Sequence, residues 1–207
     1  VSHNLGLIRA LCKRGILLEA GAVRYDGSVE EAASLYLSGL EAAATADLAQ
    51  HLQRRGLGQV RLSRLDISVP GERDAGILEP GRPARFVFMT SGILPGLTCS
   101  FTLYDSAGRP VTYFDSAIGG PGDVDDADGA PCFVCELDQL MLVPGRYRLN
   151  AALSCDGQLQ DHVEGAAILE VRDGAASGRR VVAAPGYGST FMHHRWLRSR
   201  ASGAGAA

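Results

Sequence analysis

Residues 60–69 read VRLSRLDISV and carry apolar side chains at a spacing of two. Val60 and Leu62 begin this alternation, and it resumes in a new phase at Leu65 after a slip of one residue. A spacing of two places successive apolar side chains on one face of an extended chain. Pro70-Gly71 then ends the segment with a turn signal. The segment therefore predicts a β-strand.

Six more segments of similar length follow, separated by turns that contain glycine or proline. They cover residues 85–90, 97–104, 111–114, 131–137, 147–154 and 166–171. Sustained helical periodicity is missing from this part of the sequence. Seven short strands with Gly/Pro turns are typical of an antiparallel sandwich. The predicted fold class is thus mainly β, an antiparallel Ig-like or jelly-roll β-sandwich.

The N-terminal part has a different pattern. Residues 5–14 predict a short amphipathic helix, and residues 15–25 predict two short strands around a tight turn. Ser28, with Glu31 three residues later, forms a capping box at the start of a second helix. Residues 40–55 are rich in alanine and predict a helical connector. A further strand is expected near residues 180–184.

The composition excludes several classes of protein. The 207 residues are 46% apolar and 21% charged, and their net charge of −3 gives no bias toward nucleic acid. Lysine occurs only at Lys13, outside any Gly-Lys-Ser/Thr sequence, so there is no phosphate-binding P-loop. Five cysteines are an odd and scattered set, which favours a reducing compartment over a disulfide framework.

Charge is distributed unevenly along the chain. Residues 1–55 hold 6 basic and 6 acidic side chains, residues 56–173 hold 9 and 17, and residues 174–207 hold 5 and 0. The chain thus divides into neutral, acidic and basic parts. We expect the basic segment 179–200 to contact either anionic headgroups or the acidic body of a partner subunit.

The first forty residues resemble the last stretch of an ABC-transporter nucleotide-binding domain. The resemblance rests on Val1-Ser2-His3-Asn4, the helix ending in LCKR, the strand GILLE and the Tyr25-Asp26-Gly27 turn before the second helix, all in the same order. It implies that His3 is the switch histidine that contacts the ATP γ-phosphate in an intact subunit. Walker A, signature and Walker B motifs are missing from this sequence. The chain is therefore interpreted as a C-terminal fragment.

With a sandwich following this stretch, the whole sequence is similar to ATPase subunits of bacterial polysaccharide exporters, especially O-antigen exporters. The resemblance implies a sandwich that recognises the glycan terminus, a homodimer, a transmembrane permease partner, and ATP and Mg in the intact subunit. It places the protein in the cytoplasm, at the inner face of the membrane through the permease. The implied domains are a nucleotide-binding remnant (1–40), a connector (41–57), a carbohydrate-binding sandwich (58–173), dimerisation strands (174–200) and a disordered tail (201–207).

A sugar site needs aromatic faces for the apolar side of a ring and planar polar groups for its hydroxyls. The candidate substrate-binding residues in the sandwich are Tyr104, Arg109, Tyr113, Asp115 and Tyr147. Phe114, Tyr187 and Trp196 are further aromatic candidates, and Arg85, Asp105, Arg146, Arg148 and Asn150 are further polar ones. Alternation tells which of these share a face, but not which face binds.

Two other motifs do not predict metal sites. Cys132 and Cys135 have C-x-x-C spacing, but on a strand they point to opposite faces and no second pair accompanies them. The acidic run 123–129 fails the calcium-loop pattern, because Val124 and Cys135 occupy ligand positions. Two alternatives to glycan recognition stay open: a regulatory module of an ABC ATPase, and a purely dimerising C-terminal module.

We expect this chain alone not to hydrolyse ATP, because the groups that bind phosphate and magnesium are missing from its sequence. The measurement is phosphate release from MgATP by the purified protein. Turnover that persists through repeated purification would contradict this prediction.

Overall fold

In the computed structural model, the described residues are 5–19, 21–43, 47–51, 54–72, 77–124, 130–184 and 188–196. The helices are α1 (Leu5–Leu11), α2 (Val29–Ala43) and the 3₁₀ turn η1 (Leu48–Gln50). The strands are β1 (Arg14–Glu19), β2 (Ala22–Ser28), β3 (Arg54–Arg55), β4 (Leu62–Ser68), β5 (Ala84–Thr90), β6 (Leu97–Tyr104), β7 (Pro110–Asp115), β8 (Cys132–Leu137), β9 (Gly145–Cys155), β10 (Gln158–Val171), β11 (Gly174–Ala176) and β12 (Arg179–Val181).

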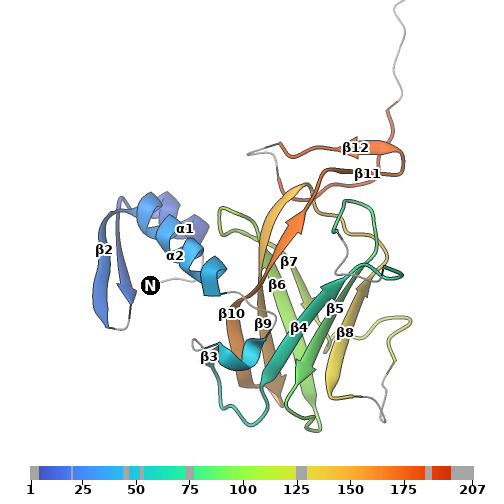
Figure 1. Cartoon of the computed structure of the whole chain (residues 1–207), viewed down its shortest axis with the longest axis horizontal. Coiled ribbons are helices and arrows are strands. Elements are labelled where there is room, and N and C mark those ends of the chain that lie inside the picture. Colours follow the sequence, from blue (N-terminus) through green and yellow to red (C-terminus); the bar gives the residue numbers. More distant parts are fainter. Residues whose placement is uncertain are drawn as a thin grey trace, which may run out of the picture.

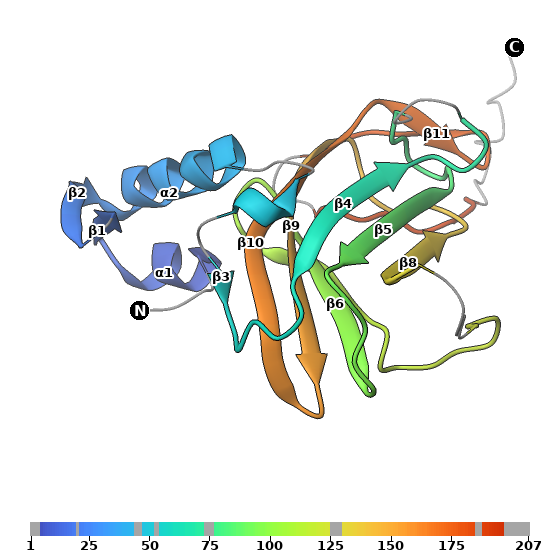
Figure 2. The same cartoon turned by 60° about the horizontal axis from the view of Figure 1, so that its bottom comes forward.

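Two sheets form the sandwich. One has the strand order β3-β10-β9-β6-β7 and the other β4-β5-β8, and every strand pairing within the described residues is antiparallel. Figures 1 and 2 show α1, α2 and the β1–β2 hairpin to one side of the sandwich, near β10, with the β11–β12 hairpin at one end. The predicted mainly β antiparallel sandwich is confirmed.

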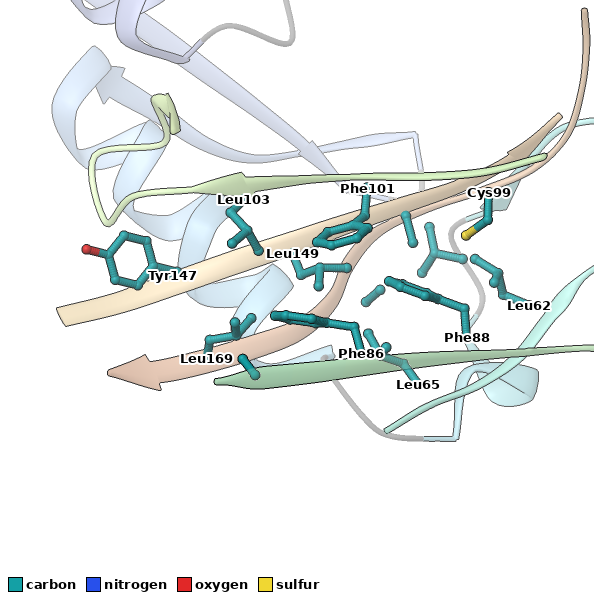
Figure 3. Packing of buried hydrophobic residues seen from close by; sticks show 14 of the residues in the cluster. Leu62, Leu65, Phe86, Phe88, Cys99, Phe101, Leu103, Tyr147, Leu149 and Leu169 are labelled. Carbon is teal, nitrogen blue, oxygen red and sulfur yellow. The ribbon is translucent and has the colours of Figure 1, made fainter. Parts of the chain in front are cut away.

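The core lies between the two sheets and is built from their inward-facing side chains (Figure 3). Phe86 and Phe88 from β5 meet Phe101 from β6 at ring-centroid distances of 5.2 and 5.0 Å. Phe101 also stacks on Phe114 from β7 at 4.5 Å. Such aromatic pairs each contribute about 0.5–1.5 kcal/mol beyond the burial of their area. The aromatic cluster therefore holds the two sheets together.

The predicted slip in the alternation of residues 60–69 is a β-bulge. The pairing of β4 with β5 shifts register between Leu62 and Arg64. The extra residue lets both Leu62 and Leu65 point into the core, where they are 0% and 3% exposed. In β8, Cys135 packs against the same core, and strand alternation turns Cys132 to the opposite face, as predicted.

The N-terminal helix, hairpin and second helix are present as predicted. Ser28 Oγ accepts a hydrogen bond from the Glu31 backbone N at 3.2 Å, which is one half of the capping box. The other half runs through Tyr25, whose hydroxyl donates to Glu31 Oε2 at 2.7 Å and accepts from the Ser28 backbone N at 3.2 Å. The start of α2 is therefore tied to the β1–β2 hairpin.

The prediction of a helical connector over residues 40–55 is wrong in part. Among the described residues, α2 covers Val29–Ala43, Leu48–Gln50 form the 3₁₀ turn η1, and Arg54–Arg55 form the short strand β3, which pairs with β10. β10 is longer than predicted. Its first half was not predicted from the sequence because that half is polar and the two register shifts in its pairing with β9 break the alternation. β11 was not predicted, and β12 covers the start of the strand expected near residues 180–184. Within the described residues, no helix is long and apolar enough to cross a membrane.

A buried ion pair joins the connector to the sandwich. Arg54 and Asp161 have side chains that are 7% and 2% exposed, and Arg54 Nη2 lies 2.6 Å from Asp161 Oδ2. Arg54 also donates to the carbonyl oxygens of Leu48 and Leu62. Asp161 Oδ2 accepts from the Leu62 backbone N at 2.8 Å. Two separate segments, the connector and the start of β4, therefore converge on one carboxylate in β10.

Replacing Asp161 with alanine should lower the free energy of unfolding by roughly 3–5 kcal/mol, because Arg54 would stay buried without its partner. Urea unfolding measures the change. The matched control is Asp66→Ala, which breaks the exposed ion pair between Arg64 and Asp66 and should change the midpoint little. Equal midpoints for the two variants would contradict the prediction.

Candidate functional site

The candidate site lies on the outer face of the five-stranded sheet, where β6 and β7 pair. Leu97, Cys99, Phe101 and Leu103 of β6 point inward and are buried. Strand alternation therefore turns Thr98, Ser100, Thr102 and Tyr104 outward. This outer surface contains three of the five candidate residues predicted from the sequence.

Tyr113 and Asp115 are brought together on β7. Tyr113 is 56% exposed, and its hydroxyl donates to Asp115 Oδ2 at 2.8 Å. Burial, followed by the hydrogen bond to Asp115, raises the pKa of Tyr113. Asp115 Oδ1 accepts from the Ala117 backbone N at 2.9 Å, which fixes the carboxylate. The pair presents an aromatic ring beside a planar oxygen acceptor.

Small side chains border this pair on the neighbouring strands. Thr102 lies opposite Tyr113, and Ser100 lies opposite Asp115 and, on its other side, Ala152 of β9. Directly opposed residues have Cβ atoms about 4.5–5.5 Å apart. We call Ser100, Thr102, Tyr113, Asp115 and Ala152 the outer platform. It combines one exposed aromatic ring, one carboxylate and two hydroxyl groups, and its remaining side chains are short.

Tyr104 lies on the same face, but one side of its ring is covered. The guanidinium carbon of Arg148 lies 4.5 Å from the centroid of the Tyr104 ring. Arg148 is 6% exposed, and its Nη1 donates to Asn150 Oδ1 at 2.5 Å. The cation–π contact stabilises this corner of the face. Tyr104 thus borders the outer platform with one ring face already in use.

Arg109 has a structural contact in the turn between β6 and β7. Its Nη2 and Nε both lie 2.8 Å from Asp105 Oδ2. Asp105 Oδ1 also accepts from the backbone N of Ala107 and of Arg109, at 3.0 and 2.9 Å. A carboxylate that accepts successive backbone N–H groups in this way holds an Asx-type turn. The structure therefore separates Arg109 from the Tyr113–Asp115 pair and gives it a role in the turn.

Tyr147 is a core residue, which corrects its selection as a sugar-binding candidate. It is 3% exposed, and its ring lies among the inward-facing side chains (Figure 3). Its hydroxyl lies 2.8 Å from the Val143 carbonyl oxygen and 3.0 Å from that of Ser189. Phe114 is partly buried and packs against the core, with one ring face stacked on Phe101. Tyr147 therefore has no exposed ring face for a ligand, and Phe114 uses one face in the core.

Two further candidates lie outside the described residues: His3, expected to contact ATP in an intact subunit, and Tyr187, an aromatic candidate for the sugar site. Lys13 is exposed between α1 and β1. Within the described ranges, no group of three or more His, Cys, Asp or Glu side chains is placed to hold a metal ion. ATP and Mg therefore remain expectations for an intact subunit.

A bulge in β10 links the outer face to α2. Residues 164–166 lie opposite Asn150, whose Oδ1 accepts from the Gly165 backbone N at 2.9 Å. Gly165 has φ +68°, and a Cβ there would lie 3.1 Å from the Leu40 carbonyl oxygen, so the end of α2 packs closely on the bulge. Glu164 accepts from the Tyr36 hydroxyl of α2 at 2.5 Å. Burial and this bond raise the pKa of Tyr36 to about 12.

A second contact joins α1 to the β6–β7 turn. Arg9 Nη1 donates to the Ala107 carbonyl oxygen at 2.9 Å. Gly108 has φ +76°, and a Cβ there would lie 2.9 Å from Leu5 Cδ1. Both N-terminal helices therefore contact the sheet that carries the outer platform.

The small side chains of the outer platform were not predicted as site residues from the sequence. Ser100, Thr102 and Ala152 come from two strands, and only their cross-strand register brings them beside Tyr113. The alternation of β6 did indicate that Ser100 and Thr102 share a face with Tyr104.

Comparison with known proteins gives a likeness among solved structures alone. No family model matches the chain, and no curated protein matches its sequence. The chain is similar to a solved structure described as the crystal structure of the C-terminal domain of Wzt, with a TM-score of 0.49 and 16% sequence identity. The match covers 69% of this chain and 88% of that chain. It is a likeness of fold to that domain, and the residue assignments above do not rest on it.

Tyr147 should make the protein sensitive to alkali. Burial raises its pKa to about 12 in the folded protein, whereas an exposed tyrosine titrates near pH ~10. Above that pH the unfolded chain releases a proton that the folded protein keeps, so the free energy of unfolding falls as pH rises toward 12. We expect a shallower fall in Tyr147→Phe, measured by urea unfolding across this range. An unchanged slope would contradict the prediction.

Proposed function

We propose that this chain is the C-terminal part of the ATPase subunit of an ABC transporter that exports cell-surface polysaccharide of the O-antigen type. In this proposal the sandwich recognises the glycan terminus and couples its binding to export. The N-terminal helix–hairpin–helix order supports the first part. The outer platform supports the second, and the observation that carries it is the exposed Tyr113 ring fixed beside Asp115.

The platform suits a neutral sugar ring. An exposed aromatic face covers the C–H side of a pyranose, and fixed carboxylate and hydroxyl groups pair with its hydroxyls. Asp115 keeps acceptor capacity after binding the Tyr113 hydroxyl and the Ala117 backbone N, since an ionised carboxylate has about four lone-pair sites. Ser100 and Thr102 supply groups that both donate and accept.

The proposed coupling runs through the β10 bulge. Thr102 of the outer platform lies opposite Asn150, and Asn150 Oδ1 holds the Gly165 backbone N. Gly165 packs against Leu40 of α2, and Glu164 bonds Tyr36 on the same helix. A ligand that favours one arrangement of this bulge would change the equilibrium position of α2. Energetic coupling of this kind needs a contiguous set of contacts with two arrangements.

The remaining parts of the proposal concern assembly. The protein acts as a homodimer at the cytoplasmic face of the membrane, held there by the permease subunit, with ATP and Mg bound by the complete nucleotide-binding domain. Dimerisation brings two sandwiches to one transporter and raises the local concentration of binding sites for a long polymer.

The test is binding of the full chain to an array of bacterial O-polysaccharides with capped and uncapped non-reducing ends. We expect at least one polysaccharide to bind, and Tyr113→Ala to weaken that binding about tenfold or more through loss of the ring face. The array and a titration with the best-bound polysaccharide measure this.

The matched control is Val134→Ala, which removes an exposed apolar side chain from the other sheet. It should leave glycan affinity unchanged. Absence of binding to every polysaccharide by a folded dimer would overturn the proposal in favour of a purely dimerising module. Equal losses in the two variants would overturn the outer platform as the binding surface.

A further inference from the structure

A groove of about 700 Å³ lies at the end of the sandwich, away from the outer platform. One wall is the β11–β12 hairpin and the other is the segment 188–195. The hairpin turns at Ser177-Gly178, with φ values of +50° and +74°, which is the geometry of a two-residue type I′ turn. A volume of this size is within the range of small-ligand sites.

The second wall is anchored to the sandwich. The Val143 backbone N donates to the Ser189 carbonyl oxygen, and the Phe191 backbone N donates to that of Met141, both at 3.1 Å. Ser189 Oγ also donates to Asp105 Oδ2 at 3.3 Å. The segment is therefore fixed along residues 141–143, and the groove has two structured sides.

His193 bridges the two walls. Its Nε2 lies 2.5 Å from Gln139 Oε1 and its Nδ1 lies 3.1 Å from Ser177 Oγ in the hairpin turn. Because the amide oxygen only accepts, Nε2 donates to Gln139, and Nδ1 pairs with the Ser177 hydroxyl. Phe191 packs edge-on to this ring at 6.0 Å. The groove thus has fixed aromatic side chains on one side.

The charge lining the groove is entirely positive. Arg179, Arg180 and Arg195 line it together with two histidines, and among the described residues no Asp or Glu belongs to its lining. Arg180 lies 3.6 Å from Asp173, but both side chains are about three-quarters exposed, and such pairs are held weakly in water. Arg179 makes a long bond of 3.4 Å to the His194 carbonyl oxygen. Guanidinium groups in these contacts can turn to a bound anion.

We propose that this groove binds an acidic saccharide through its carboxylates. The guanidinium fork matches a carboxylate in two-point geometry, and the Phe191 and His193 rings offer surfaces to the C–H groups of the sugar. The inference rests on the proposed function only in taking the ligand to be a glycan. It adds a second site for a different ligand. The groove would bind an acidic sugar, whereas the outer platform suits a neutral sugar ring.

The charge distribution of the chain directs such a ligand to this end. Residues 56–173 hold 9 basic and 17 acidic side chains, whereas residues 174–207 hold 5 basic and no acidic ones. An anionic chain is repelled by the sandwich body and attracted to the groove, and this steering weakens as salt rises.

The experiment is calorimetric titration of the full chain with tetragalacturonate at low salt. The matched ligand is its fully methyl-esterified form, which has nearly the same shape and no charge. We expect the acid to bind at least about tenfold more tightly than the ester, and to lose about tenfold or more in Arg179→Ala/Arg180→Ala. High salt should weaken the binding of the acid.

The control variant is Arg64→Ala/Arg85→Ala, which removes the same charge from exposed positions on the three-stranded sheet. It should leave tetragalacturonate affinity unchanged. Equal losses in the two double variants would show attraction by bulk charge and overturn the proposal. Equal affinity for the acid and the ester would also overturn the proposal. A dimer that buries the groove between two copies of the chain and does not bind tetragalacturonate would overturn it as well.

A third variant separates this inference from the proposed function. Tyr113→Ala lies on the outer platform and should leave tetragalacturonate binding unchanged. If Tyr113→Ala abolishes tetragalacturonate binding while Arg179→Ala/Arg180→Ala keeps it, the groove is not the site and the inference fails, although the outer platform stands. If the array shows no bound O-polysaccharide while tetragalacturonate still binds through the arginines, the proposed function fails and the groove stands.

Discussion

The buried carboxylate of Asp161 is the point on which the arrangement of the chain depends. It receives Arg54 from the connector and the backbone of Leu62 from the start of β4, so it sets where the N-terminal part joins the sandwich and where the three-stranded sheet begins. Removing two charges from water costs several kcal/mol per ion, and that cost is offset only when every hydrogen-bonding group is satisfied. Leu48 and Leu62 complete this requirement by accepting from the guanidinium. The ion pair therefore fixes how the connector packs on the sandwich, and it is not a source of net stability.

The strand that carries this ion pair, β10, also contacts α2 and belongs to the sheet that carries the outer platform. β10 holds Asp161 on its inner face, and a few residues later its bulge carries Glu164 and Gly165 on the side that meets α2. β10 thus binds the connector through its inner face and contacts α2 through its outer face. The outer platform lies farther across the sheet, on β9, β6 and β7, whereas α2 packs at the β10 side.

Local alternation predicted most of the sandwich, because half-buried strands have a simple period. It even located the bulge in β4, since the slip after Leu62 is visible in the order of apolar residues. The first half of β10 was missed because Asp161 and Gln160 are buried polar residues, which alternation assigns to solvent. The connector was predicted as helix because its alanines favour helix, but tertiary pairing of Arg54 with β10 overrides that propensity. For the site, the spacing of Tyr113 and Asp115 placed both on one face, whereas the partners Ser100 and Ala152 depend on a register that no single strand contains.

The position of the outer platform at β7 has a consequence for selectivity. β7 is the border strand of its sheet, and no strand of the described chain lies beyond it. If such a surface binds glycan, the border position alone does not distinguish the end of a linear polymer from its middle, because no described strand continues past β7. Recognition of a glycan terminus therefore needs a further contact beside β7, and the turn that Asp115 holds through the Ala117 backbone N is the segment that follows this strand directly. The length and composition of this turn would then determine whether such a protein binds only the end of a glycan or any part of the polymer.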